Sequence, residues 1–262
     1  MRPRPAARRP SGALVMAGVC HRDAPLDLRQ QRALDEEGAL LALRALRDGG
    51  VAREALALST CNRVELYAAG DDPAALRERL RRTLGAGEVT IVREGREAAH
   101  HLMRVASGLE SRVPGDDGIR GQLRDATALA RGDGATGIVL NRLVDAALDC
   151  GRRVRRARAV PRGPSSVAGV AVALAVARTG PLAGRTALVV GRGRVGREAA
   201  HALAEAGAVV LTAGRRETSD PTTLTRLLTA AGIVITATST PGPVISREAL
   251  ASAPRPGGTG TL

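Results

Sequence analysis

The chain has 262 residues and a formal net charge of +13, with no tryptophan, no phenylalanine and a single aromatic residue, Tyr67. This length suits two ordinary domains with a proper apolar core, and the lack of aromatic residues excludes the stacking platforms that proteins use on single-stranded nucleic acid. The charge favours encounter with polyanions such as nucleic acid or a phosphorylated ligand, although the absence of lysine indicates a compositional bias towards arginine.

Three cysteines, Cys20, Cys61 and Cys150, lie far apart in the sequence. No pair has the spacing of metal ligands, so we expect no metal site, reduced thiols and a cytoplasmic location. No apolar run reaches transmembrane length. Residues 1–12 are rich in arginine and proline without an apolar stretch, which predicts a disordered basic extension. The alternative for this segment is an organelle-targeting peptide.

Residues 13–160 alternate short apolar runs with amphipathic stretches, which predicts an α+β domain. The expected strands are Ala13–Val19, Leu56–Ser59, Val64–Ala68 and Val89–Val92. The expected helices are Leu26–Asp48, Pro73–Leu84, Glu97–Leu109, Gly121–Arg131 and Val139–Arg158. The last helix ends in a cluster of arginines that could contact phosphates, although the solvated face of a helix is the alternative: Arg152, Arg153, Arg155, Arg156 and Arg158.

Cys61 occupies a tight connection between two of these strands, within the segment LSTCNRVELY at 58–67. A neighbouring cation such as Arg63 lowers the pKa of a thiol and raises the fraction of thiolate, which is the nucleophile. The alternative is a small buried hydrophobic residue, because free cysteine is among the most buried residue types. The polar neighbours Thr60, Asn62 and Arg63 favour an activated nucleophile.

Residues 161–262 have the pattern of a dinucleotide-binding fold. A Pro/Gly-rich break and a Ser-capped helix to Ala177 precede three expected strands, Arg185–Val190, Ala208–Thr212 and Ile233–Ala237, with helices Arg197–Ala206 and Leu224–Ala231 between them.

A glycine motif directly follows the first of these strands, and a helix follows the motif. Its residues, which we expect to bind the cofactor, are Gly191, Arg192, Gly193, Arg194, Val195 and Gly196. Arg215 and Arg216 follow the second strand in place of the acidic residue that binds the ribose of NAD, which favours NADP. The alternative is a Gly-rich turn that has lost its ligand.

Several motifs in this order resemble the glutamyl-tRNA reductase family, and the resemblance extends over most of the chain. They are GVCHRDAP at 18–25, STCNRVE at 59–65, HLMRVASGLES at 101–111, GQ at 121–122, LNRL at 140–143 and SSV at 165–167. The resemblance implies an α/β protein with an N-terminal α+β catalytic domain and a Rossmann-like NADP-binding domain. It also implies NADPH-dependent reduction of glutamyl-tRNA to glutamate-1-semialdehyde, the first step of tetrapyrrole synthesis.

The implied reaction is covalent catalysis in two steps. Cys61 attacks the ester that joins glutamate to its tRNA, which gives a thioester and free tRNA, and NADPH then delivers hydride to the thioester. His101 would act as a proton-transfer or positioning group, the alternative being an exposed or capping helix residue. Arg63 would pair with the side-chain carboxylate of the substrate. The substrate-binding residues that the resemblance implies are Thr60, Cys61, Asn62, Arg63, Ser111, Asp116, Asp117, Gly118 and Gln122.

The chain also departs from the family. Gly115-Asp116-Asp117-Gly118 replaces the usual Gly-Glu-Pro-Gln, and the chain stops at Leu262, before the family's dimerisation domain. We therefore expect an incomplete NADP-binding domain and a homodimer that is lost or weakened. A glutamate-1-semialdehyde aminomutase is the partner that would receive the product. Two alternatives stay open: a catalytically decayed paralogue that binds tRNA or a partner, and a shikimate-dehydrogenase-like NADP oxidoreductase.

Overall fold

The computed structural model describes residues 12–85, 91–157, 166–238, 240 and 242–253. The chain divides into two compact units, Met1–Arg162 and Gly163–Leu262. The extension predicted at 1–12 lies outside the described residues except for Gly12. Among the described residues, no helix is both long and apolar enough to cross a bilayer.

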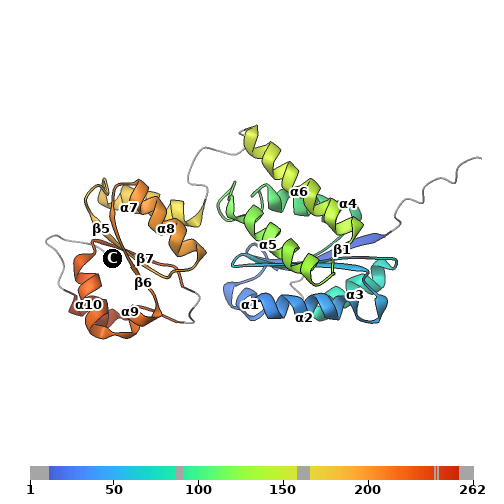
Figure 1. Ribbon diagram of the computed structural model, residues 1–262, viewed down its shortest axis with the longest axis horizontal. Coiled ribbons are helices and arrows are strands. Elements are labelled where there is room, and N and C mark those ends of the chain that lie inside the picture. Colours follow the sequence, from blue (N-terminus) through green and yellow to red (C-terminus); the bar gives the residue numbers. More distant parts are fainter. Residues whose placement is uncertain (1–11, 86–90, 158–165, 239, 241, 254–262) are drawn as a thin grey trace, which may run out of the picture. The chain divides into compact units, whose positions relative to one another are not determined.

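The first unit is built on an antiparallel sheet of four strands in the order β2-β3-β1-β4. The strands are β1 (Ala13–Cys20), β2 (Glu54–Thr60), β3 (Arg63–Gly70) and β4 (Ile91–Glu94). Helices α1 to α3 lie on one face of the sheet and α4 to α6 on the other (Figure 1). The helices are α1 (Leu26–Gln31), α2 (Glu36–Arg47), α3 (Pro73–Thr83), α4 (Gly95–Ala106), α5 (Gly118–Gly132) and α6 (Ile138–Arg156), with a 3-10 turn at Asp48–Gly50.

The single helix predicted over Leu26–Asp48 is wrong, because the chain forms two helices there. Asp35 has extended backbone angles, and its side chain accepts the backbone N–H of Gly38 at 2.8 Å. An N-cap aspartate satisfies a free donor of the following helix and so begins α2, which separates it from α1. The strand expected at Val89–Val92 begins at Ile91, and its first two residues lie outside the described residues.

The second unit is a parallel sheet of three strands in the order β6-β5-β7. Alternate residues of β5 enter two separate apolar clusters: Ala187 and Val189 pack with α7 and α8, and Leu188 and Val190 with α10. Burial on both faces explains why this strand is apolar throughout. The elements are α7 (Val167–Thr179), β5 (Thr186–Val190), α8 (Arg194–Glu205), β6 (Val209–Ala213), α9 (Arg215–Ser219), α10 (Pro221–Ala230), β7 (Ile233–Thr236) and α11 (Arg247–Ser252).

The α/β class predicted from sequence is confirmed, and two local differences bear on the cofactor motif. Helix α8 begins at Arg194, inside the glycine motif, and not at Arg197. Arg215 and Arg216 lie in the short helix α9, which the sequence analysis did not anticipate. The incompleteness expected of this unit stays a prediction.

Gly18 lies at a close contact between two strands of the first sheet, opposite Glu65 across β1 and β3. A Cβ atom there would come within 2.7 Å of the Val64 carbonyl and 2.8 Å of Glu65 Cγ. We therefore expect Gly18→Ala to lower the free energy of unfolding by about 1–3 kcal/mol through overpacking. Urea denaturation followed by circular dichroism measures this.

Gly121→Ala is the matched control. A Cβ at this position in α5 would meet no atom within 4 Å. The same substitution should therefore raise the free energy of unfolding by about 0.5–1 kcal/mol, through helix propensity alone. Equal effects of the two substitutions would refute the steric argument.

Candidate active site

Cys61 lies at the tip of the β2–β3 hairpin, and its side chain is exposed. The hydroxyl of Thr60 accepts the backbone N–H groups of Asn62 and Arg63, both at 3.2 Å, which closes the turn. Two contacts from outside the hairpin hold the tip. The buried Arg29 of α1 donates to the carbonyl of Cys61, and the N–H of His21 donates to the carbonyl of Asn62 at 2.8 Å. The turn therefore presents the sulfur to solvent on a fixed backbone.

The other two cysteines lie in different surroundings. Cys20 is buried, and its Sγ donates to a carboxylate oxygen of Asp23 at 2.8 Å. Burial, together with the hydrogen bond to Asp23, raises the pKa of the Cys20 thiol. Cys150 on α6 is half-buried, within 3.8 Å of the Ser107 hydroxyl. Cys61 is thus the most accessible of the three, which counts against its interpretation as a small buried hydrophobic residue.

A buried carboxylate, Glu65, organises the sheet behind the hairpin tip. Arg63, Glu65 and Tyr67 alternate along β3 and so point to one face of the sheet. Glu65 accepts hydrogen bonds from Arg63 Nη1 at 2.9 Å, from Tyr67 Oη at 2.8 Å and from His101 Nε2 at 2.9 Å. Because a carboxylate can only accept, Nε2 of His101 is the donor in this hydrogen bond. The four side chains form one connected polar network within the core.

The network keeps Glu65 ionised. Burial alone raises the pKa of this carboxyl, but the hydrogen bond from His101 and the charge of Arg63 outweigh burial and lower the pKa from 4.5 to about 2. Burial, with the adjacent Glu65, raises the pKa of Tyr67 well above its usual value, so the phenol stays a hydrogen-bond donor. The network therefore holds one negative carboxylate and the positive Arg63 in the low dielectric of the core.

Arg63 is buried within this network. Its side chain is 1% exposed, and besides Glu65 it donates through Nη2 to the carbonyl of Glu110. Its Nε is buried without a partner among the described residues. Arg63 is therefore an anchor between β3 and the loop that follows α4. Its predicted contact with a substrate carboxylate stays a prediction.

His101 also contributes to this network. The imidazole on α4 is buried and bonded to Glu65, so it is neither an exposed nor a capping helix residue. Its predicted role in catalysis is untested by this geometry. The structure brings His101 and Arg63 together through one shared oxygen of Glu65.

The segment 107–117, between α4 and α5, holds several of the predicted substrate-binding residues. Glu110 accepts from Arg104 Nε and, at 2.7 Å, from Arg22 Nη1, and the next residue, Ser111, is buried. Gly115 donates to the carbonyl of Gly108 at 3.1 Å, which folds the segment back on itself. Asp116 accepts the N–H of Gly118 at 2.9 Å, and so shapes the start of α5.

Asp117 faces the arginine cluster at the end of α6. It pairs with Arg120 at 3.0 Å and with Arg155. Arg152 and Arg153 pair with Asp149 at 3.0 and 3.4 Å. Arg158, the last member of the predicted cluster, lies outside the described residues.

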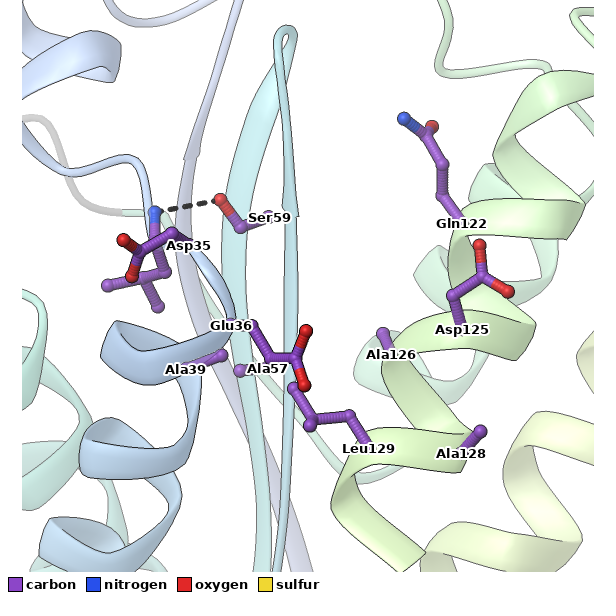
Figure 2. A pocket seen from close by; sticks show the side chains of 11 residues that line it. Asp35, Glu36, Ala39, Ala57, Ser59, Gln122, Asp125, Ala126, Ala128 and Leu129 are labelled. Carbon is purple, nitrogen blue, oxygen red and sulfur yellow. Dashed lines mark hydrogen bonds between the residues drawn. The ribbon is translucent and has the colours of Figure 1, made fainter. Parts of the chain in front are cut away.

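Gln122 lines a cavity of about 540 Å³ at the open edge of the sheet, between α2 and α5. Figure 2 shows its amide extending from α5 towards the end of the hairpin, with Ser59 across the cavity on β2. Ser59 lies two residues before Cys61, and its hydroxyl accepts the N–H of Leu34 at 2.9 Å, the dashed line in Figure 2. The carboxylates of Asp35, Glu36 and Asp125 also line this cavity, so part of its lining is acidic.

In the second unit, the glycine motif lies at the carboxyl end of the central strand β5. A Cβ on Gly191 would come within 2.1 Å of the Ala237 carbonyl, and one on Gly196 within 1.9 Å of the Gly191 carbonyl. A Cβ on Gly193 would meet nothing within 4 Å. The first and third glycines are thus required by backbone contact, and the second leaves open space at the start of α8, the place that a phosphate group occupies in dinucleotide-binding folds.

The remaining residues predicted to bind the cofactor surround this loop. Arg194 pairs with Glu198 at 2.7 Å, and Val195 packs against the apolar cluster under α8. Arg215 and Arg216 are exposed in α9, directly after β6. Arg192 pairs at 2.8 Å with Glu217, a residue that the sequence analysis did not consider.

Sequence analysis also missed Arg29, Glu65 and Glu110. For Glu65 a signal existed, since Arg63, Glu65 and Tyr67 alternate and so share one face of a strand. No local pattern marks Arg29 or Glu110, because each acts across a long sequence separation. In the described part of the chain, no group of His, Cys, Asp or Glu side chains could hold a metal ion.

The buried network makes a prediction about stability. Removing the charge of Glu65 by Glu65→Gln leaves Arg63 buried without its counter-ion, so the free energy of unfolding should fall by about 3–5 kcal/mol. The pKa of Glu65 is depressed in the folded state, so its stabilisation is present above pH 4.5 and is lost as the pH falls towards about 2. Urea denaturation at several pH values should show that this loss is absent from the variant.

Glu94→Gln is the control for this prediction, because Glu94 pairs with Arg77 at the surface, where both side chains are more than 40% exposed. It should change the free energy of unfolding by less than about 1 kcal/mol. A Glu65→Gln variant as stable as the wild type would contradict the role of the network.

Comparisons with known proteins agree with the motifs. Residues 17–158 match the family described as "Glutamyl-tRNAGlu reductase, N-terminal domain". The chain is 36% identical over 255 residues to glutamyl-tRNA reductase 2 of Anaeromyxobacter dehalogenans, covering 92% of this chain and 57% of that protein. It is 41% identical over 203 residues to glutamyl-tRNA reductase of Marinobacter nauticus, covering 74% of this chain and 47% of that protein.

A solved structure is similar along most of the chain. Glutamyl-tRNA reductase from Methanopyrus kandleri superposes with a TM-score of 0.58 at 30% identity, covering 92% of this chain and 62% of that one. The chain spans about half the length of the curated relatives it matches. By the motifs around Cys61, the family match over residues 17–158 and this structural likeness, the chain belongs to the glutamyl-tRNA reductase family.

Proposed function

We propose that this chain catalyses the NADPH-dependent reduction of glutamyl-tRNA to glutamate-1-semialdehyde, with Cys61 as the nucleophile. The observation that carries the proposal is the exposed sulfur at the tip of a hairpin held by Thr60, Arg29 and His21. Such a sulfur is accessible to an ester, and the backbone that carries it is held in place, which suits covalent catalysis. In this proposal glutamyl-tRNA is the substrate, and a cytoplasmic aminomutase receives the product. The match to the glutamyl-tRNA reductase family disfavours the alternative of a shikimate-dehydrogenase-like activity.

The first step is an acyl transfer. The thiolate of Cys61 attacks the carbonyl carbon of the ester, and the bond from that carbon to the ribose oxygen breaks. The departing ribose oxygen takes a proton from water and leaves as the hydroxyl of the free tRNA. Glutamate then stays attached to the sulfur as a thioester. The exposed thiol explains how the bulky tRNA end reaches the nucleophile, and the net positive charge of the chain favours its approach.

His101 is a positioning residue in this proposal. Its Nε2 is already bonded to Glu65, which in turn fixes Arg63 and through it the segment that carries Ser111 and Asp116. Arg63 is likewise a positioning residue here, because its side chain is 1% exposed and holds the carbonyl of Glu110. Gln122, in the cavity beside Ser59, is the amide that contacts the bound aminoacyl group.

The second unit fits a dinucleotide. Gly193 leaves open space at the amino end of α8, where backbone N–H groups attract a pyrophosphate. Arg215 and Arg216 are exposed at the end of β6, the strand that neighbours β5 in the sheet. These residues would hold NADPH, which supplies a hydride when bound. On receiving a hydride the acyl group leaves as the aldehyde, and the C–S bond breaks to restore the Cys61 thiolate.

Cys61→Ser tests the proposal. Wild-type protein incubated with radiolabelled glutamyl-tRNA, without NADPH, should retain the glutamate label after acid precipitation and nuclease treatment, and the variant should retain none, because a thioester needs the sulfur. Adding NADPH to the wild type should then release labelled glutamate-1-semialdehyde, measured by chromatography after trapping the aldehyde.

Cys150→Ser is the matched control, since it removes a thiol that lies away from the hairpin on α6 and should leave labelling unchanged. Label on the Cys61→Ser variant would exclude Cys61 as the acyl acceptor. Wild-type protein that takes no label would point to a tRNA-binding or decayed paralogue, and label without reduction would place the failure in the second unit.

A further inference from the structure

The second residue of the glycine motif is an arginine whose side chain crosses from the loop after β5 to the helix after β6. Arg192 Nη2 donates to Glu217 Oε1 at 2.8 Å, and the side chains are 58% and 26% exposed. Strand β6 pairs with β5, so the carboxyl ends of the two strands are neighbours and the ion pair spans them. The pair therefore lies where a dinucleotide bound to the glycine loop would place its ribose.

Glu217 is fixed in this position from a second side. Its other oxygen, Oε2, accepts the backbone N–H of Gly214 at 2.8 Å, directly after β6. This hydrogen bond, with the one from Arg192, lowers the pKa of Glu217, so the side chain is a carboxylate at neutral pH. A carboxylate at the end of the second strand accepts hydrogen bonds from ribose hydroxyls and repels a 2′-phosphate.

The end of β6 thus carries opposing signals, since Arg215 and Arg216 favour a phosphate and Glu217 disfavours one. Arg192 decides which signal prevails, because its guanidinium forms an ion pair with the carboxylate of Glu217 and neutralises its charge. Gly214 allows this arrangement: a Cβ there would lie 3.3 Å from Arg192 Nη1 and 3.4 Å from Glu217 Oε2, so a larger residue would crowd both groups.

We propose that the Arg192–Glu217 ion pair sets the cofactor selectivity of this chain, with Arg192 masking a carboxylate that would otherwise select NADH. The inference rests on the proposed binding of a dinucleotide and adds the residue pair that discriminates its 2′-phosphate. It predicts that the preference depends on the masking of Glu217 as well as on the charge of Arg215 and Arg216.

Dissociation constants of NADPH and NADH test this directly in the full chain, from the change in nicotinamide fluorescence on binding. Arg192→Ala should lower the preference for NADPH over NADH by about tenfold or more, because the unmasked carboxylate repels the phosphate. Glu217→Gln should keep the preference or raise it. The double variant should recover to within roughly threefold of the wild-type preference, since the carboxylate is then absent.

Arg185→Ala is the matched control, because it removes the same charge beside the opposite, amino end of β5 and should leave the preference unchanged. Both members of the pair are at the surface, and thermal unfolding of each variant checks that the fold is intact. An unchanged preference in Arg192→Ala, an equal loss in Arg185→Ala, or a double variant as impaired as Arg192→Ala would each overturn the inference while dinucleotide binding stands. Wild-type protein that binds neither dinucleotide would refute the cofactor part of the proposed function, and this inference with it.

Discussion

The first unit depends on the carboxylate of Glu65, which accepts hydrogen bonds from an arginine, a histidine and a tyrosine inside the core. A lone buried charge would cost several kcal/mol, and here the opposite charge of Arg63 and three donors offset that cost. The arrangement also needs Gly18, because no other residue leaves room for Glu65 on the neighbouring strand. The network therefore links β1, β3 and α4, and through Arg63 it also fixes the segment 107–117.

This rigid support explains how a hairpin tip can carry a reactive group. Loops are ordinarily more mobile than the elements they connect. Here the carbonyls of Cys61 and Asn62 accept hydrogen bonds from α1 and from the residue after β1, and Thr60 closes the turn from within. The backbone is held by its carbonyl groups, so the side chain of Cys61 stays free to react.

In the second unit the glycine loop is held by close contacts between backbone atoms, which only residues without a side chain allow. Gly191 and Gly196 bring the loop against Ala237, the residue after β7, and against itself, closer than any Cβ would allow. The loop thereby places the amino end of α8 beside open space at the carboxyl edge of the sheet. The side chain of Arg192, at the one loop position between the first two glycines, is free to reach the neighbouring strand.

The sequence alone determined the two-part α/β order, most of the strands and helices, the hairpin around Cys61 and the glycine loop, because hydrophobic period, caps and turn residues act over a few neighbouring positions. It failed where such local signals compete, as at Asp35, whose cap divides one amphipathic stretch into two helices. Only the tertiary structure decided that Arg63 pairs with Glu65, that Arg29 holds the Cys61 carbonyl and that Arg192 covers Glu217. Those pairings depend on strand register and on the packing of distant segments, and neither can be predicted from the spacing of residues along the chain.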